Sequence, residues 1–511
     1  MSTRTRTKAL GDYIKGRFVR RRHAAGELHR VDPGDLDAVG DVFPMYAEAL
    51  DEACAAAREA LATWAAPEAA EARAAALRRI KAQLQNAAEE LGEQLTRETG
   101  RPRWDTRQEV RLLRREIDLM LRGGLAELVS REPIPPDCAV EYRPRGVVAI
   151  LASSSQPAAT IHADVIAALA VGCTVVVKPS PLTPGLGQLY ATLMHDADLP
   201  RGVFNMVQGD DEVGVRLATH EAVDVVLFSG RRRSAEQIVE DLTCRSDEGV
   251  RSRPLLRART SGCSLALVLD DANLDEAASE IVMGACLATG QRATTTRGVI
   301  VERRIADALR DRLQRMLVKL SVGHGSRPDI FMGPLVSAEA SERFAEDATR
   351  LRDEAARQHI RSEVNLRATP GDDKSPRGHY VRPGLFAFPR EAFIEALVDE
   401  LTGPLLLLTE VDNFDEGASL LRESPRRLAH AVFTRDLARV GNLQAKVDAP
   451  LLIANASTTT WRGELPLEPD YELGAALASG VLTARTLTTA CVTVSRSSAF
   501  DATMLPPGLK L

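Results

Sequence analysis

The chain has 511 residues, 44% hydrophobic and 27% charged, which is long enough for about three domains and typical of a globular rather than a disordered protein. Its 65 basic and 71 acidic residues give a net charge of −6, which argues against a generally basic nucleic-acid binder and favours a soluble cytoplasmic protein. Seven scattered cysteines without a Cys-x-x-Cys pair argue against a disulfide framework or a zinc site, and no apolar run approaches the roughly 18 residues of a membrane span. We therefore expect no metal, no nucleic acid and no membrane among its partners.

The first elements in chain order are helical. Residues 49–99 repeat apolar positions at intervals of three and four, which predicts amphipathic helices, and a further helical stretch covers 107–129. From residue 146, helical segments alternate with short β-branched runs. These runs are GVVAIL, TVVVK, VFNMV and DVVLF, at 146–151, 174–178, 203–207 and 224–228. The alternation predicts parallel βαβ units in a doubly wound, Rossmann-type domain, which we assign to 1–129 and 146–256.

A second alternating block follows. It contains strand-like runs at 265–269, 299–302, 405–411 and 451–455, and helical segments at 275–288, 303–320 and 338–358. This block predicts a second α/β domain over 257–455. The strand-like pieces AVEYRPR (139–145) and TACVTVSR (489–496) fit neither sheet, so we assign 130–145 and 482–499 to a bridging β arm. The open edges of such an arm would pair with a neighbour, which predicts a homodimer or a higher homo-oligomer.

Eight motifs follow one another along the chain: YRPRGVVAIL, AALAVGCTVVVKPSPLTP, LPRGVFNMVQGDDEVG, VDVVLFSG, LALVLDDANLDEA, MGPLVS, DELTGP and AVFTRDL. From about residue 12 to the end of the chain, their order and spacing resemble the aldehyde dehydrogenase superfamily. Within it, the chain is most similar to succinylglutamate semialdehyde dehydrogenases, through ETGRPRWDTRQEV, NMVQGDDEVG, GQRATTTRGVIV and the tail LPPGLKL. The resemblance implies an aldehyde-dehydrogenase-like α/β fold and oxidation of an aldehyde by NAD or NADP.

The resemblance also implies a mechanism. A cysteine thiolate attacks the aldehyde, a hydride leaves for the nicotinamide, a glutamate activates the water that hydrolyses the thioester, and an asparagine amide stabilises the oxyanion. The sequence departs from the family at all three positions. Ser155 stands where the asparagine belongs, Arg259 replaces the glutamate, and Ala293 replaces the cysteine. Because losing a covalent nucleophile costs about a millionfold in turnover, we expect the family's chemistry to be absent.

Other residues are poor replacements for the missing groups. We interpret Cys286 and Cys263 as core thiols, and the threonines at 294–296 have no evident base to activate them. A buried arginine needs a partner, which leaves two alternatives for Arg259. Either it makes the former catalytic pocket an anion-binding site, or it pairs internally with an acid such as Glu400 and the pocket is closed.

The motifs for cofactor binding give mixed signals. Lys178 ends a predicted strand, where an open α/β sheet binds its ligand, and the resemblance assigns this lysine to the adenosine ribose. The alternative is a surface lysine. Gly209 and Gly214 match a turn that approaches the cofactor, or they are ordinary loop glycines. Glu400 matches a contact to the nicotinamide ribose, or it is a surface carboxylate.

Other positions argue against the family's binding mode. After Ser180, Pro181 replaces the glutamate that pairs with the ribose hydroxyls, which removes an NAD preference and leaves NADP conceivable. Gly230 is followed by Arg231, where the family has a small serine facing the pyrophosphate; Arg231 would either clamp phosphate or fill the site. The family's glycine-rich segment has no match in 462–474. If NAD or NADP binds, the residues expected to contact it are Lys178, Ser180, Gly209, Gly214, Gly230, Arg231 and Glu400.

Three functional hypotheses follow. The first is a catalytically inactive binding or scaffolding subunit, in a homo-oligomer or with an active paralogue. The second is a sensor that binds NAD(P) or another anion. The third is an aldehyde or semialdehyde dehydrogenase that works with non-standard catalytic residues.

Overall fold

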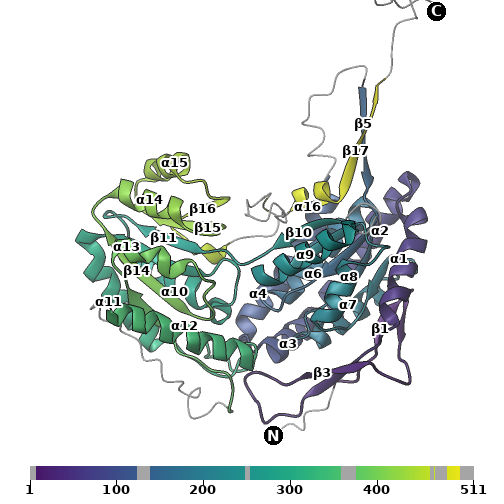
Figure 1. Ribbon diagram of the computed structural model, residues 1–511, viewed down its shortest axis with the longest axis horizontal. Helices are drawn as coiled ribbons and strands as arrows, with labels where there is room; N and C mark the ends of the chain where they lie inside the picture. Colours follow the sequence, from purple (N-terminus) through teal and green to yellow (C-terminus); the bar gives the residue numbers. More distant parts are fainter. Residues whose placement is uncertain are drawn as a thin grey trace, which may run out of the picture.

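The computed structural model describes the chain at residues 7–123, 138–247, 254–357, 376–460, 465 and 480–494. Two α/β units with separate sheets make up most of these residues, and a two-stranded ribbon leaves the first unit (Figure 1). Several sequence predictions lie outside the described residues: most of 462–474, the tail from 505, and the outer parts of the β arm at 130–137 and 495–499. Within the described ranges, no helix is long and apolar enough to cross a bilayer, and no three metal-ligand side chains gather in one place.

The first unit is built on a seven-stranded sheet with the order β10-β9-β6-β7-β8-β1-β2. Its parallel strands are β6 (Val147–Leu151), β7 (Thr174–Lys178), β8 (Phe204–Met206), β9 (Val225–Ser229) and β10 (Leu255–Arg259). Antiparallel β1 (Asp12–Ile14) and β2 (Arg17–Val19) extend one edge. The order of the parallel strands reverses at β6, so the sheet is doubly wound as predicted. β10 carries this sheet to Arg259, past the boundary that we had placed at residue 256.

Helices cover both faces of this sheet (Figure 1). One face packs against α1 (Ala49–Trp64), α8 (Asp211–Ala218) and α9 (Arg232–Asp247). The other packs against α2 (Ala70–Asn86), α3 (Ala88–Thr99), α4 (Arg103–Leu121), α6 (Pro157–Val171) and α7 (Pro184–Asp196). Side chains of β6 alternate between the two cores, with Val147 and Ala149 on the first face and Val148 and Ile150 on the second. Burial on both faces explains why these strands are continuous apolar runs.

The second unit has a six-stranded, wholly parallel sheet. In sheet order its strands are β13 (Gly384–Ala387), β14 (Leu405–Val411), β12 (Thr296–Glu302), β11 (Ser264–Val268), β15 (Ala429–Phe433) and β16 (Leu451–Ala454). One face carries α10 (Leu274–Cys286) and α11 (Arg303–Lys319). The other carries α12 (Ala338–Arg357), α13 (Arg390–Phe393), α14 (Phe414–Glu423) and α15 (Leu437–Lys446).

The ribbon confirms that two strand-like pieces lie outside both sheets. β5 (Cys138–Pro144) pairs antiparallel with β17 (Thr488–Val494), which follows α16 (Val481–Thr486). The ribbon projects away from the body of the first unit (Figure 1) and leaves Val492 and Val494 exposed. A second antiparallel pair, β3 (Gly26–Arg30) and β4 (Asp41–Met45), was not predicted.

Candidate active site

A cavity of about 1030 Å³ has walls from both units. The first unit lines it with residues at the carboxyl ends of β6, β7, β9 and β10, the edge at which doubly wound sheets bind ligands. The second unit lines it largely with the loops that precede β12 and β14 and with the start of α12. All but one of the predicted site residues contribute to the wall: Ser155, Lys178, Ser180, Gly214, Gly230, Arg231, Arg259, Ala293 and Glu400.

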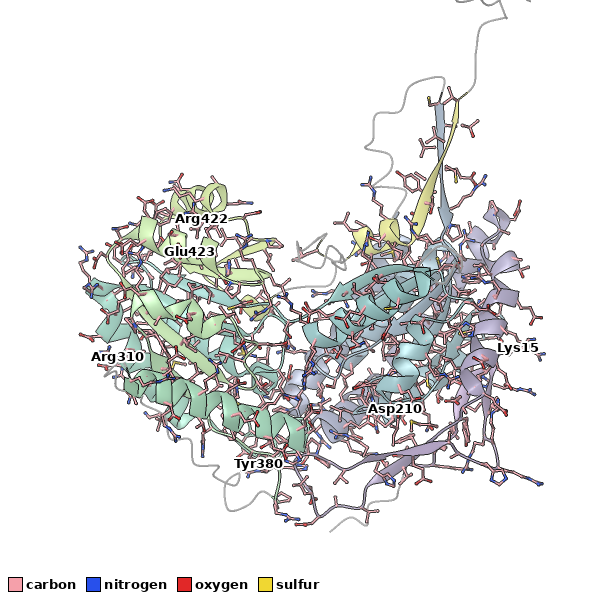
Figure 2. The ribbon with its side chains drawn as sticks, in the orientation of Figure 1. Lys15, Asp210, Arg310, Tyr380, Arg422 and Glu423 are labelled. Atoms are coloured by element: carbon pink, nitrogen blue, oxygen red, sulfur yellow. The ribbon has the colours of Figure 1, made fainter. Side chains whose placement is uncertain are left out.

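The exception, Gly209, lies in the turn that receives Lys178. The Lys178 ammonium donates a hydrogen bond to the Gly209 carbonyl oxygen at 3.1 Å, and the Lys178 side chain is buried. A side chain at Gly214 would place its Cβ 3.2 Å from Lys178 Cε, so this glycine leaves room for the lysine. Asp210, labelled in Figure 2, caps α8 beside the turn by accepting from the Val213 N–H at 3.1 Å. Lys178 is therefore not the surface lysine of the alternative interpretation.

Burial lowers the pKa of Lys178 to about 8, and the nearby carboxylates of Asp211 and Asp210 act in the opposite direction. Ser180, two residues further on, is buried, and its hydroxyl accepts from the Leu182 N–H at 3.2 Å. Glu400 differs from both because it is an exposed side chain at the edge of the cavity. The cavity wall next to β7 therefore contains a buried lysine side chain.

Gly230 and Arg231 connect β9 to α9 at the cavity wall. A Cβ at Gly230 would lie 2.4 Å from Phe228 Cζ, so a side chain is excluded there unless the ring moves. The Gly230 N–H donates to the Arg259 carbonyl oxygen at 3.1 Å, which joins the two strand ends. Arg231 is 47% exposed and its Nη1 lies 3.3 Å from Glu339 Oε1 on α12. Arg231 therefore lies at the opening of the cavity rather than buried inside it.

Ala293 lies in a loop whose backbone is strained. The preceding residues Ala288, Thr289 and Gly290 have φ of 51°, 57° and 65°, and a β-branched threonine rarely adopts this left-handed conformation. The Thr289 hydroxyl donates to the Gly333 carbonyl oxygen at 3.0 Å, and Arg297 Nη2 donates to that of Gly290 at 2.8 Å. These contacts hold the loop, and with it Ala293, in one position.

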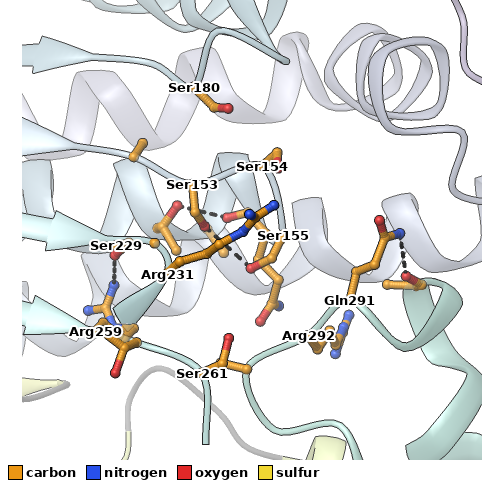
Figure 3. A pocket seen from close by; sticks show the side chains of 18 of the residues that line it. Ser153, Ser154, Ser155, Ser180, Ser229, Arg231, Arg259, Ser261, Gln291 and Arg292 are labelled. Carbon is orange, nitrogen blue, oxygen red and sulfur yellow. Dashed lines mark hydrogen bonds between the residues drawn. The ribbon is translucent and has the colours of Figure 1, made fainter. Parts of the chain in front are cut away.

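Ser155 and Ser261 line the same cavity as Ala293, and both are labelled in Figure 3. The Ser155 and Ser153 hydroxyl oxygens lie 3.3 Å apart, within hydrogen-bond distance. The Gly262 N–H donates to the Ala293 carbonyl oxygen at 3.0 Å, which ties the loop after β10 to the loop before β12. The three positions at which the sequence departs from the family resemblance thus lie around one cavity.

Arg259 pairs inside the protein, but with a partner that we did not predict. Its Nη2 lies 3.3 Å from Asp164 Oδ1 and its Nη1 donates to Ser229 Oγ at 3.1 Å (Figure 3). Glu400 is not its partner, which corrects that expectation. Burial raises the pKa of Asp164, and the Arg259 guanidinium opposes this shift. One signal was available in the sequence, because Asp164 is the only carboxylate in the largely apolar segment 157–171.

A buried network of charged groups in the cavity wall also escaped sequence analysis. Arg101 Nε and Nη2 donate to the two oxygens of Asp105 at 2.7 and 2.8 Å, and Arg101 also pairs with Glu109. Arg292, next to Ala293, reaches the same Asp105 at 3.1 Å. Although burial raises the pKa of Asp105, Arg101 and Arg292 together lower it below its ordinary value. The spacing of four residues between Arg101, Asp105 and Glu109 was the signal that we missed.

No cysteine lines the described part of the cavity wall. All seven cysteines are free, and Cys263 and Cys286 are 1% and 0% exposed. Burial raises the pKa of both thiols, in Cys286 to about 12, so neither supplies a thiolate near neutral pH. Their interpretation as core thiols is confirmed.

Comparison with known proteins identifies a family and relatives for this chain. The model of the aldehyde dehydrogenase family matches residues 19–467. The N-succinylglutamate 5-semialdehyde dehydrogenase 1 of Caulobacter vibrioides is 30% identical over 440 residues, which cover 85% of this chain and 89% of the relative. The N-succinylglutamate 5-semialdehyde dehydrogenase of Paraburkholderia xenovorans is 27% identical over 431 residues, covering 84% and 85%.

Solved structures show the same fold. Lactaldehyde dehydrogenase from Escherichia coli superposes with a TM-score of 0.82 at 26% identity, over 94% of this chain and 98% of that one. A cysteine-to-alanine variant of aldehyde dehydrogenase C from Pseudomonas syringae, in complex with NAD⁺ and octanal, superposes with a TM-score of 0.85 at 24% identity, over 96% and 98%. The fold class that we predicted is confirmed.

Proposed function

The chain belongs to the aldehyde dehydrogenase family, and from this premise we propose that it is a catalytically inactive member that acts as a binding or scaffolding subunit. The observation that carries the proposal is the methyl side chain of Ala293, in a strained loop at the position that the resemblance gives to the nucleophile. A methyl group cannot form a covalent bond to an aldehyde carbon. No thiol in the described lining of the cavity replaces it.

The two other positions support the same proposal. A guanidinium such as that of Arg259 is permanently protonated, so it cannot accept a proton from the hydrolytic water. Its ion pair with Asp164 also holds it against the wall. Ser155 offers one hydroxyl in place of an amide, and the loss of one oxyanion donor costs roughly 3–4 kcal/mol in the transition state.

The cleft fits a dinucleotide in part. The volume suffices for a large ligand, and Lys178 with Gly214 and Glu400 would contact the two riboses. The Pro181 side chain offers no acceptor for ribose hydroxyls, so we propose that the sensor alternative takes either NAD or NADP, without a strong preference. The bound cofactor would supply a hydride acceptor. Because the P. syringae variant holds both NAD⁺ and octanal, an alanine in place of a cysteine is compatible with a bound cofactor and aldehyde in that protein.

The sensor hypothesis remains a second candidate because Lys178 is buried and directed at the Gly209 turn. Burial of a lysine ammonium group lowers the stability of the folded protein, and binding of an anionic ligand would offset that cost. If the cofactor binds and no aldehyde is turned over, the subunit reports nucleotide occupancy.

We also propose that the chain assembles as a homodimer or larger oligomer, alone or with an active paralogue, in the cytoplasm. An isolated two-stranded ribbon is marginally stable in water, and β5 and β17 leave both outer edges open. Analytical ultracentrifugation of the full chain tests this proposal. A monomer at micromolar concentration would contradict the homo-oligomer.

The test of inactivity is an assay of the purified full chain with NAD and with NADP on several semialdehydes, including N-succinylglutamate 5-semialdehyde. We expect no formation of reduced cofactor above the background without protein. Calorimetric titration with each cofactor then separates a scaffold from a sensor. Turnover that disappears when a cavity residue such as Ser155 is replaced would instead establish an enzyme with non-standard catalytic residues.

A further inference from the structure

A serine, a histidine and an aspartate outside the cavity are aligned at hydrogen-bond distances. His324 and Ser326 lie in the loop between α11 and α12, and Asp32 lies in the loop between β3 and β4. His324 Nδ1 lies 2.7 Å from the Ser326 hydroxyl oxygen, and His324 Nε2 lies 3.3 Å from Asp32 Oδ2. None of the three belongs to the described cavity wall. A nucleophile, a base and a carboxylate that orients the base thus meet at a second place in the molecule.

The contacts of the His324 ring assign its tautomer. The Ser326 N–H donates to Nδ1 at 3.3 Å, so Nδ1 presents a lone pair and the proton of the neutral ring lies on Nε2. That proton faces the Asp32 carboxylate. The lone pair on Nδ1 faces the Ser326 hydroxyl, from which it can accept a proton. His324 therefore has the tautomer that a general base for Ser326 requires.

Exposure falls from the nucleophile to the carboxylate. Ser326 is exposed, whereas the side chains of His324 and Asp32 are 17% and 3% exposed. Shielding from water strengthens the interaction of the Asp32 carboxylate with the histidine, and the serine hydroxyl stays open to a reagent from solution. The Gly34 N–H donates to Asp32 Oδ1 at 2.9 Å. Tyr380, labelled in Figure 2, donates from its hydroxyl to the Gly34 carbonyl oxygen at 2.7 Å, so both bonds hold the loop that carries the carboxylate.

The loop that carries the histidine and the serine is fixed by the glycine between them. A Cβ at Gly325 would lie 2.6 Å from the carbonyl oxygens of both Gly100 and Arg101, so only glycine fits there without a shift of the backbone. The Gly325 carbonyl oxygen accepts from the Arg103 N–H at 3.1 Å. The base and the nucleophile on either side of this glycine are therefore held in position before any reagent arrives.

We propose that Ser326 is an activated nucleophile that accepts an acyl group from activated esters, with His324 as its general base and Asp32 as a positioning residue. Ser326 Oγ forms a bond to the acyl carbon, and the bond from that carbon to the leaving-group oxygen breaks. The serine proton moves to His324 Nδ1 and from there to the leaving oxygen, so the products are an acyl-serine and an alcohol. The site uses no thiol and no cofactor, so it goes beyond the proposed function and holds or fails separately from it.

The experiment treats the purified full chain with p-nitrophenyl acetate and follows acetylation of individual serines by mass spectrometry of their peptides. We expect acetylation of Ser326 in the wild type, and His324→Gln should slow it about a hundredfold, the size of effect that a general base contributes. The matched control is Ser279, an exposed serine whose hydroxyl donates to the Asp275 carbonyl oxygen at 2.8 Å. Its acetylation should be much slower than that of Ser326 and should not respond to His324→Gln.

Two substitutions of Asp32 test its positioning role. Asp32→Asn should slow acetylation of Ser326, and Asp32→Glu, which keeps the charge, should recover part of that loss, with circular dichroism showing that both variants are folded. An unmodified Ser326 in the wild type, equal acetylation rates of Ser326 and Ser279, or a Ser326 rate that His324→Gln leaves unchanged would overturn the proposal. These readouts contain neither aldehyde nor cofactor, so they are independent of the test of inactivity.

Discussion

The two sides of the cavity have diverged in different ways. The side formed by the first unit keeps a buried polar group in the cavity wall, because Lys178 is buried and donates to the Gly209 carbonyl oxygen. The side that carries Ala293 keeps the backbone, including the left-handed residues before it and the hydrogen bond from Gly262, but has a methyl group where the nucleophile is expected. Backbone geometry and reactive side chains are therefore separable: the first depends on packing throughout a unit, and the second on a few atoms.

The arginines that line the cavity near the positions of the expected chemistry pair with carboxylates inside the protein. Arg259 has Asp164, and Arg292 shares Asp105 with Arg101. A buried charge without a partner is costly, which explains why Arg259 and Arg292 each pair with a carboxylate inside the protein. These ion pairs make the charged residues of the cavity wall part of the folded structure. The following predictions test how much they contribute to stability and activity.

The largest effect is expected from breaking the buried network. Arg101→Met leaves Asp105 and Glu109 buried with too little positive charge, which should lower the free energy of unfolding by about 3–5 kcal/mol. Urea denaturation monitored by circular dichroism measures it. The control is Arg78→Met, which breaks the exposed pair with Glu71 and should change stability by less than about 1 kcal/mol. Equal effects of both substitutions would contradict a special role for the buried network.

In the first unit, Lys178 makes the stability of the protein depend on pH. Its folded pKa of about 8 lies below the ordinary 10.5, so between these values the unfolded chain binds more protons than the folded one. Stability contributed by this group therefore rises from about pH 8 to pH 10.5, by at most about 3 kcal/mol. Urea denaturation across this range should show the rise in the wild type relative to Lys178→Met. Parallel curves for the two proteins would refute it.

Restoring a glutamate at position 259 should be harmful by itself. Arg259→Glu places a second carboxylate beside the buried Asp164, and we expect a loss of about 2 kcal/mol in the free energy of unfolding. Adding Asp164→Asn removes the repulsion and should recover about half of the loss. Thermal and urea unfolding of the single and double variants measure both steps. A fully stable single variant would mean that Arg259 and Asp164 are not energetically coupled.

The smallest effect is expected from restoring the thiol. Ala293→Cys supplies a nucleophile, but Arg259 cannot activate water and Ser155 is a weaker donor than an amide, so turnover should stay close to the background. Assays with NAD and NADP should show clear activity only after Arg259→Glu, Asp164→Asn and Ser155→Asn are added. Substantial turnover by the single variant would show that the other two departures are tolerated.

The difference between the two sides also explains what sequence could predict. The parallel strands and their helices were predicted because burial on both faces makes continuous apolar runs such as 174–178. β10 was missed, because the two arginines in its sequence LLRAR interrupt the apolar pattern. Because this strand was not predicted, the domain boundary was placed too early, at residue 256.

Ion pairs between residues far apart in the chain could not be predicted from the sequence. Arg259 and Asp164 are 95 residues apart in the chain, and Arg231 and Glu339 are 108 apart. Composition and periodicity describe neighbours along a helix or strand, whereas these contacts depend on how whole elements pack. The sequence identified which groups had changed at the cavity, but not which groups compensate for them.

The most direct test of the proposed inactivity is intact-mass spectrometry of the full chain after incubation with N-succinylglutamate 5-semialdehyde and NAD⁺. Any thioester should persist for detection, because Arg259 cannot promote its hydrolysis. We predict an unmodified mass at all times. An added acyl group that maps to a cysteine, such as Cys263 or Cys286, would contradict the account.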